Sequence, residues 1–549
     1  MTYKKNLITE HIQRFLGICG LIVILFVAVG CGSDSSDRFT CYSVDSDTKG
    51  CMETVNHIQN VSITSNDSNV FKAEYEAGFI QGRLQRNTIL SARDNFWDMA
   101  YLTDPSHTFP KQIPPSKAEL QIAQDVLVQN LDYTLRYMAS TDDALVAENL
   151  QRILYRMLGI YHGAVRGEPA PLDFSQFTMS LFSDEDLKLG YNTPNLTFID
   201  VYYINAYADV TDVLDDIHDD PLIDNSDKCS AFVKKDANDI YITHNSWSGY
   251  LNQSNALTMY INGDYLTVNT LAPGSAVSNT DFGYNNKGIM FNETTHHATY
   301  TEPKITALWM FVRAALAEQF SSSLDEFFRY MSLEPSGTYM NGYMIVDTKT
   351  EEIGLIEMSF KNFIYFKSDG RGGYIITTKP DGISKTYDRT MVQSDYIIGV
   401  NYPASQQIRD DLKAVDTRPA RKRQFLALKD TVKDIESSKA LITYTDPSNP
   451  LSIYGRWDLG YGETDYPKTV PDGSVDAKAV SASMISYIWN LNGTLDLDSP
   501  NPAFWMKYGT TYVDGKPFIW SESQWKGQIL RDVPDSQDGE FTLLKSYIR

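Results

Sequence analysis

The chain has 549 residues, of which 42% are hydrophobic and 12% aromatic, and this composition argues against a disordered protein. Its formal net charge of −22 argues against nucleic acid and anionic membrane surfaces as partners, because phosphate binding needs clustered cations. We expect the excess acidic residues to lie on a solvated surface and no nucleic acid to bind.

The N-terminus is predicted to be an export signal. Basic residues precede an apolar run, residues 15–29, which has the layout of a signal peptide and is short for a membrane span. The sequence Val-Ala-Val-Gly-Cys31, followed by a polar stretch, resembles a bacterial lipobox. We therefore expect residues 1–30 to be removed and Cys31 to carry lipid, as in a lipoprotein that contacts the cell-envelope membrane only through this anchor.

An ordinary signal peptide cut nearby is the alternative. The sequence also contains six Asn-X-Ser/Thr sequons, which would suit a secreted or lysosomal glycoprotein. They begin at Asn60, Asn66, Asn195, Asn252, Asn292 and Asn492. Such short patterns arise often by chance, so the lipobox weighs more.

Residues 31–70 are rich in Ser, Asp, Thr and Asn and are predicted to be a tether with little core. Cys41 and Cys51 lie close together in this exported segment, where a local disulfide is plausible. Cys229 then remains as an unpaired thiol in an exported protein, which singles it out.

Residues 71–228 carry helical patterns. Apolar residues recur at three- and four-residue steps in 117–137 and 142–162, and a further helix is expected over 198–217. Gly78 and Gly82, four residues apart, share one helix face and allow a second helix to pack closely. The acidic run from Asp209 to Asp227 does not match an EF-hand, and we expect it to be solvated.

After Cys229 the patterns favour strands. Hairpins are predicted over 257–268, 343–359 and 362–378, and an amphipathic helix pair over 303–331 begins at Pro303. Groups of strands with helices between them indicate an α+β layered fold.

The stretch from Lys228 to Tyr250 is the most informative one. Its two β-prone runs flank a charged turn at 235–238, so a hairpin would bring His244 close to Cys229. A thiol beside a positioned polar group is a candidate nucleophile. A buried structural cysteine in a hairpin is the alternative.

Several motifs in this order resemble the phospholipase B-like family of N-terminal nucleophile hydrolases. They are Cys229-Ser-Ala with His244-Asn-Ser-Trp247, Ala272-Pro-Gly-Ser275 with Asp281-Phe282, Asn292-Glu-Thr-Thr295, Ser336-Gly-Thr-Tyr-Met-Asn341 with Met344-Ile-Val-Asp347, and Gly473-Ser-Val-Asp-Ala-Lys478. The resemblance runs from about Tyr75 to the C-terminus. Several motifs in one order are more specific than any single motif.

The resemblance implies a fold and a maturation step. The fold would be a four-layer αββα sandwich preceded by an N-terminal helical segment. The precursor would cut itself between Lys228 and Cys229, leaving a helical chain, 71–228, associated with a catalytic chain, 229–549. The freed α-amine of Cys229 would then be the base for its own thiol.

Further site roles carry over from the resemblance. Asn401, in Gly-Val-Asn-Tyr-Pro403, would bind the oxyanion, and Arg421 would be a cation near the thiol, with Arg418 and Arg423 as alternatives. His244 is a candidate catalytic residue. Trp247 and Thr295 are candidates for the substrate pocket.

The sequence therefore predicts an exported, self-processing hydrolase that cleaves an amide or ester bond of a small acylated substrate. We expect no cofactor, and no metal at the paired His296 and His297, which lack further ligands at metal spacing. The alternatives are a lipid-anchored binding protein that retains the fold without activity, and a thiol acyltransferase.

Overall fold

The computed structural model describes residues 38–549 except for 101–113, 219–228, 417–418, 447–450, 456–471, 510–518, 524–525, 528 and 537–538. The predicted signal peptide, Cys31, Lys228 and Arg418 lie outside the described residues. Residues Cys41–Arg549 form one compact unit. Among the described helices, none combines the length and the apolar character that a bilayer span requires.

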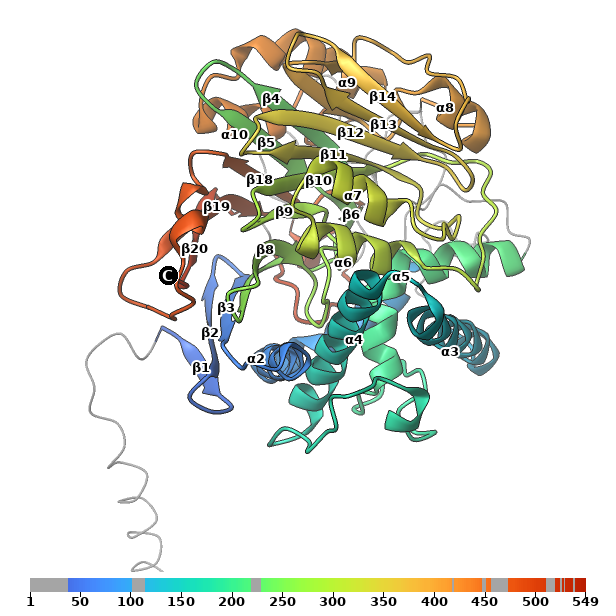
Figure 1. Cartoon of the computed structure of the whole chain (residues 1–549), viewed down its shortest axis with the longest axis vertical. Coiled ribbons are helices and arrows are strands. Elements are labelled where there is room, and N and C mark those ends of the chain that lie inside the picture. Colours follow the sequence, from blue (N-terminus) through green and yellow to red (C-terminus); the bar gives the residue numbers. More distant parts are fainter. Residues whose placement is uncertain are drawn as a thin grey trace, which may run out of the picture. The chain divides into compact units, whose positions relative to one another are not determined.

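The segment from Val70 to Ile217 is mainly helical, as predicted. Its long helices are α2 (Val70–Ala100), α3 (Lys117–Ser140), α4 (Ala144–Val165) and α5 (Phe198–Ile217). Capping boxes begin α3 at Ser116 and α5 at Thr197, because each side chain accepts a hydrogen bond from an otherwise unpaired backbone N–H. Figure 1 shows these helices grouped beside α6 (Met310–Phe320).

Helices α2 and α4 approach each other through glycines. A Cβ on Gly78 or Gly82 would lie 2.2 or 2.0 Å from a backbone oxygen of α4, and a Cβ on Gly159 or Gly163 would meet α2 equally closely. The prediction that Gly78 and Gly82 allow close packing is confirmed.

The larger sheet has eleven strands in the order β1-β2-β3-β7-β8-β9-β10-β11-β12-β13-β14. Its hairpins β7–β8, β11–β12 and β13–β14 are those predicted from the sequence. The strands are β1 (Thr40–Ser43), β2 (Thr48–Val55), β3 (Ile58–Ser65), β7 (Asn255–Ile261), β8 (Tyr265–Leu271), β9 (Phe282–Asn285), β10 (Ile289–Thr295), β11 (Asn341–Asp347), β12 (Glu352–Met358), β13 (Phe363–Ser368) and β14 (Tyr374–Lys379).

The expectation of a tether over residues 31–70 is wrong for its second half. Strands β2 and β3 are mostly buried, and β3 pairs in parallel with β7, so this segment is an integral part of the larger sheet. Both faces of β3 are covered, so its sequence does not show the polar–apolar alternation of a half-exposed strand. The predicted disulfide between Cys41 and Cys51 is present and links β1 to β2.

The smaller sheet has seven strands in the order β15-β16-β4-β5-β18-β19-β20. Strands β4 and β5 form the predicted antiparallel hairpin, in which Ala231 faces His244. The strands are β15 (Val392–Gln393), β16 (Tyr396–Gly399), β4 (Ser230–Lys235), β5 (Ile240–Asn245), β18 (Asp476–Ser481), β19 (Asn501–Tyr508) and β20 (Thr542–Ser546). A separate two-stranded ribbon joins β6 (Trp247–Gly249) to β17 (Asp472–Ser474).

The two sheets contact each other where β10 crosses β4 and β5. There the Nδ2 of Asn292 donates a hydrogen bond to the carbonyl oxygen of Thr243 at 2.9 Å. Helices α6 and α7 (Leu324–Met331) contact the larger sheet, and α10 (Ile435–Ile442) contacts the smaller one. The other α-helices in the described part of residues 229–549 are α8 (Gln406–Leu412) and α9 (Pro419–Leu428). The fold is therefore mixed α+β with large sheets, as predicted.

Asp209 corrects two expectations. Its carboxylate is buried and accepts hydrogen bonds from the backbone N–H groups of Met310 at 2.7 Å and Phe311 at 3.1 Å. Asp209 is thus not part of a solvated acidic run. Helix α6 begins at Met310 and not at Pro303, because this carboxylate satisfies the first free N–H groups of the helix.

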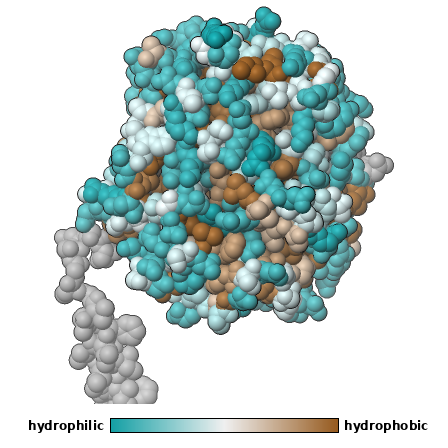
Figure 2. Space-filling model, viewed as in Figure 1, coloured by the Kyte–Doolittle hydropathy of each residue, from teal (hydrophilic) through white to brown (hydrophobic). Residues whose placement is uncertain are grey.

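The surface fits the acidic, polar composition. Figure 2 shows polar side chains over most of the visible face, with apolar residues singly or in small groups between them. Isolated exposed apolar residues of this kind are ordinary on soluble proteins.

The contact between α2 and α4 makes a stability prediction. Gly82→Ala places a methyl group against the carbonyl of Ile160, and we expect it to destabilise the protein by about 1–3 kcal/mol. Gly167→Ala is the control, because a Cβ there meets nothing within 4 Å. Differential scanning fluorimetry measures both; equal midpoints for the two variants would contradict the packing described.

Candidate active site

Cys229 lies immediately before β4, and its side chain is 2% exposed. It is a free thiol, whereas Cys41 and Cys51, the other cysteines of the described residues, are joined in a disulfide. Its Sγ, a ring nitrogen of His244 and a carboxylate oxygen of Asp281 all lie within 4.8 Å of one another. The β4–β5 hairpin thus brings the predicted histidine to the thiol, and a carboxylate joins them.

Arg421, on α9, holds the backbone around the thiol. Its buried guanidinium donates to the carbonyl oxygen of Cys229, to Ser230 Oγ at 3.1 Å and to the carbonyl oxygen of Val400 at 2.7 Å. The guanidinium also lies 5.1 Å from the centroid of the Trp247 ring, a cation–π contact. Arg423 is exposed, so of these two arginines Arg421 is the one that reaches Cys229.

Asn401 stands next to this arginine. Its Oδ1 accepts a hydrogen bond from Arg421 at 2.8 Å, and its Nδ2 donates to the carbonyl oxygen of Thr295 at 2.6 Å. Its backbone has φ of +65°, a left-handed conformation that asparagine tolerates better than most residues. The side-chain amide is therefore fixed from both ends beside the backbone of Cys229.

His244 lies against a buried ion pair. The Nζ of Lys478 is 3.2 Å from His244 Nδ1 and 2.7 Å from a carboxylate oxygen of Asp476. Burial lowers the pKa of His244 well below its ordinary value, and the charge of Lys478 lowers it further. The imidazole is therefore neutral near pH 7.

Two carboxyl groups meet on the other side of the thiol. Burial raises the pKa of Asp281 to about 6 and raises the pKa of Glu293, on β10, well above its ordinary value. The two carboxyls hydrogen-bond to each other, and Tyr339 donates to Asp281 at 3.4 Å. Each carboxyl therefore holds a proton more readily than an exposed carboxyl does.

These surroundings keep the thiol protonated. Burial raises the pKa of Cys229 well above its ordinary value, and the carboxyls of Asp281 and Glu293 raise it further. A thiol must lose its proton to act as a nucleophile. A nucleophilic role for Cys229 therefore requires a group that accepts this proton.

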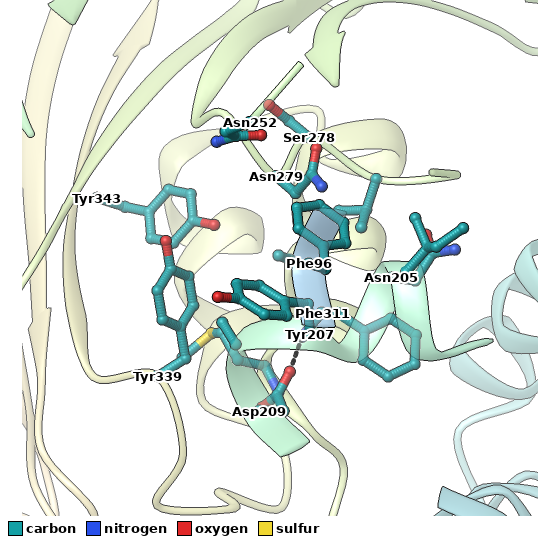
Figure 3. Close-up of a pocket in the computed structure, with 15 residues that line it drawn as sticks. Phe96, Asn205, Tyr207, Asp209, Asn252, Ser278, Asn279, Phe311, Tyr339 and Tyr343 are labelled. Atoms are coloured by element: carbon teal, nitrogen blue, oxygen red, sulfur yellow. Dashed lines mark hydrogen bonds between the residues drawn. The ribbon is translucent and has the colours of Figure 1, made fainter. Parts of the chain in front are cut away.

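An apolar pocket, drawn in Figure 3, adjoins this cluster through Tyr339. Its walls come from α2, α5, α6 and β11 and from the segments before β7, β9 and β11. Tyr339 joins the pocket to the thiol cluster, because it lines the pocket while its hydroxyl reaches Asp281 and, at 3.2 Å, Thr295. The apolar lining residues are Phe96, Ile204, Ala208, Val277, Met310, Phe311 and Ala314.

The two residues predicted for the substrate pocket lie elsewhere in the site. Trp247 is fully buried against Arg421, and its Nε1 donates to the carbonyl oxygen of Ile453 at 3.3 Å. Thr295 donates to Glu293 at 3.3 Å. Neither is among the residues that line the pocket, although Tyr339 links Thr295 to it.

Cys229, His244 and Asp281 are also residue types that bind transition metals. The ammonium group of Lys478 faces His244 and repels a second cation there, so the arrangement suits proton transfer better than cation binding. His296 and His297 are not part of any metal-ligating group among the described residues.

The residues that sequence reasoning missed stand inside motifs that it had recognised. Asp281 follows the Pro-Gly-Ser turn, Glu293 lies in Asn-Glu-Thr-Thr, Tyr339 in Ser-Gly-Thr-Tyr, and Lys478 in Asp-Ala-Lys. Their spacing in the sequence does not predict that they meet, because they come from β10, β18 and two loops. Only their positions inside the family motifs could have marked these four residues as candidates.

Comparison with known proteins identifies the relatives of this chain. A family model described as Phospholipase B matches residues 54–535. Phospholipase B of Crotalus adamanteus is 23% identical over 497 residues, which cover 81% of this chain and 80% of that protein.

Two further relatives match over a shorter part. Phospholipase B-like protein B of Dictyostelium discoideum is 23% identical over 394 residues, 61% of this chain and 63% of that protein. Putative phospholipase B-like 2 of Homo sapiens is 25% identical over 373 residues, 56% of this chain and 57% of that protein. The chain thus aligns with less than two thirds of the length of these two proteins.

Proposed function

The chain belongs to the phospholipase B family, and from that membership we propose that it is a hydrolase whose nucleophile is the thiol of Cys229. Its substrate is a small molecule with an acyl group in amide or ester linkage. One observation carries the proposal: a free cysteine at the start of an interior strand, with Arg421 on its carbonyl group and an apolar pocket nearby.

The layered contacts support a more specific fold, the αββα sandwich of the N-terminal nucleophile hydrolases. The two sheets contact each other, α6 and α7 contact the larger sheet, and α10 contacts the smaller one. In such a site the nucleophile must be the first residue of a chain, because its α-amine is the base. Cys229 stands at the required place, directly before β4.

Maturation would cut the bond between Lys228 and Cys229. The thiol adds to the carbonyl carbon of Lys228, the C–N bond breaks, and the nitrogen of Cys229 takes a proton to become an α-amine. Water then hydrolyses the thioester and regenerates the thiol. The α-amine, with a pKa of about 7.7–8, can accept the thiol proton in later turnovers.

The two chains would stay together without a disulfide. Strand β3 of the first chain pairs with β7 of the second over six residues. Asp209 of the first chain caps α6 of the second, and Asn130 donates to the carbonyl oxygens of Ile305 and Ala307. The polar and apolar contacts between the parts support continued association.

The three residues predicted to act in catalysis beside Cys229 each have a role in this proposal. Asn401 donates one amide hydrogen to the carbonyl oxygen of Thr295. Its second amide hydrogen can bind the oxyanion and stabilise the transition state by about 3 kcal/mol. Arg421 positions Asn401 and the backbone of Cys229. His244, neutral and within 4.8 Å of the thiol, orients it.

We place the protein outside the cell, tethered by lipid on Cys31. Three of the six sequon asparagines are buried: Asn60 is 1% exposed, Asn252 6% and Asn292 0%. A glycan does not fit on these three side chains in the folded protein, whereas Asn66, Asn195 and Asn492 are exposed.

The first prediction from this proposal concerns processing. Denaturing mass spectrometry of the purified protein is expected to find two chains, one beginning at Cys229. Cys229→Ala removes the nucleophile and should leave only the uncut chain, whereas Ser183→Ala, at an exposed position, should be cut like the wild type. A wild-type protein that stays intact would contradict self-processing.

The second prediction concerns the substrate. Processed enzyme is incubated with N-acyl amides and lysophospholipids of graded chain length and quenched in acid, and the C-terminal chain is weighed. We expect an acyl adduct on Cys229, sensitive to thiol alkylation and insensitive to chelators. Absence of adduct and product from both panels, with Cys229 free and N-terminal, would favour a binding protein.

A pocket variant sharpens this second test. Ala208→Phe puts a ring into the pocket from α5 and is expected to lower kcat/KM for long acyl chains about tenfold or more, and less for acetyl substrates. Ala147→Phe is the matched control, because Ala147 is also half-buried but does not line the pocket.

The third prediction concerns the anchor. Mature wild-type protein should fractionate with membranes and carry lipid on Cys31, because two or more acyl chains hold firmly. Cys31→Ser should release the protein into the soluble fraction with its hydrolytic activity retained. Equal membrane association of variant and wild type would refute the lipobox interpretation.

A further inference from the structure

Self-cleavage needs a base that the mature enzyme does not need. The α-amine of Cys229 is a base only after the chain has been cut, because before the cut the nitrogen belongs to a peptide bond. Burial meanwhile keeps the thiol protonated. If the proposed function holds, the uncut chain must contain another group that removes this proton.

Asp281 is placed for this task. A carboxylate oxygen of Asp281 lies within 4.8 Å of the Sγ of Cys229, a separation that a small side-chain rotation or one water molecule bridges. The side chain is 3% exposed, and its backbone has φ of +60°. Lys478 fixes the preceding residue, because its Nζ donates to the carbonyl oxygen of Thr280 at 2.8 Å.

The partner of Asp281 can carry the proton onward. Asp281 Oδ1 and Glu293 Oε2 are buried, and no N–H or O–H group of the described residues is within hydrogen-bonding reach of either. The side chains of Asp281 and Glu293 are hydrogen-bond partners, so a proton on one carboxyl can pass to the other. Such a pair can accept one proton and return it over a short distance.

We propose that Asp281, backed by Glu293, is the general base of self-cleavage. Its carboxylate takes the proton from Cys229 Sγ as the sulfur bonds to the preceding carbonyl carbon. When the C–N bond breaks, the carboxyl group returns this proton to the departing nitrogen of Cys229. The pair ends the step in its starting state, and no other reactant is consumed before water hydrolyses the thioester.

The other groups around Asp281 are less suited to this role. His244 faces the ammonium group of Lys478, which opposes a second positive charge on the imidazole. Tyr339 is a weak acid whose buried hydroxyl has a pKa raised well above its ordinary value. The titratable and charged groups that face Asp281 are Cys229, His244, Glu293, Tyr339, Asp476 and Lys478.

The proposal has a pH signature. The raised pKa of Asp281, about 6, means that the base is ionised above pH 6 and becomes protonated as the pH falls through 6. Self-cleavage should therefore slow about tenfold per pH unit below 6. A role for Asp281 in folding alone would not give the cleavage rate this profile.

The variant that tests the proposal is Asp281→Gly. Glycine readily adopts the φ of +60° found here, so this substitution does not strain the turn. It removes the carboxylate and leaves space that a small carboxylic acid can occupy. Full-length chains are made by cell-free synthesis, and the uncut fraction is followed by mass spectrometry. We expect cleavage to slow by about 100-fold or more, and formate to restore part of the rate.

Formamide is the matched control for formate, because it has the same shape but is not a base. Rescue by formate and not by formamide supports the proposal. Wild-type rates for Asp281→Gly, or for the isosteric Asp281→Asn, would overturn it, as would equal rescue by both additives. A wild-type chain that never cuts would instead overturn the proposed self-processing on which this inference rests.

Discussion

The buried guanidinium of Arg421 is the group on which the geometry of the site depends. A cation removed from water is costly unless its hydrogen bonds are satisfied, and here the acceptors are the carbonyl oxygens of Cys229 and Val400 and the side chains of Ser230 and Asn401. These acceptors come from β4 and the segment after β16. The hydrogen bonds of this one guanidinium therefore fix Cys229, Asn401 and α9 relative to one another.

Buried amide side chains hold the strands around the site in place. Asn245 donates from β5 to the carbonyl oxygens of Ile442 and Ile453, and Asn292 donates from β10 to β5. A one-residue shift of either strand would leave these buried amides without partners, which costs about 1–3 kcal/mol for each group. The polar residues thereby specify the register that puts His244 opposite Ala231 and beside Cys229.

Local features of this protein could be predicted from its sequence, and long-range pairings could not. The β4–β5 hairpin, the Cys41–Cys51 disulfide and the glycines of α2 depend on residues close together in the chain. By contrast, β3 lies in the sheet because it pairs with β7, almost 200 residues later, and its polar sequence resembles a tether. In the sequence, Asp209 likewise looks like its acidic neighbours. Its role as the cap of α6 follows only from the folded structure, in which it accepts hydrogen bonds from the first N–H groups of that helix.

Residues of the site were recognisable by motif, but their chemistry depends on burial. Asp281 and Glu293 are ordinary carboxylates in the sequence; only their burial away from water raises their pKa values. In our proposal the burial of the Cys229 thiol matters both before and after the chain is cut. Before the cut it keeps the thiol unreactive unless a base is in place, and afterwards the new α-ammonium group adds a positive charge beside Sγ. That charge favours the thiolate. Maturation would thus convert a protonated thiol into a nucleophile by changing one charge, while Arg421, Asn401 and the apolar pocket keep their positions.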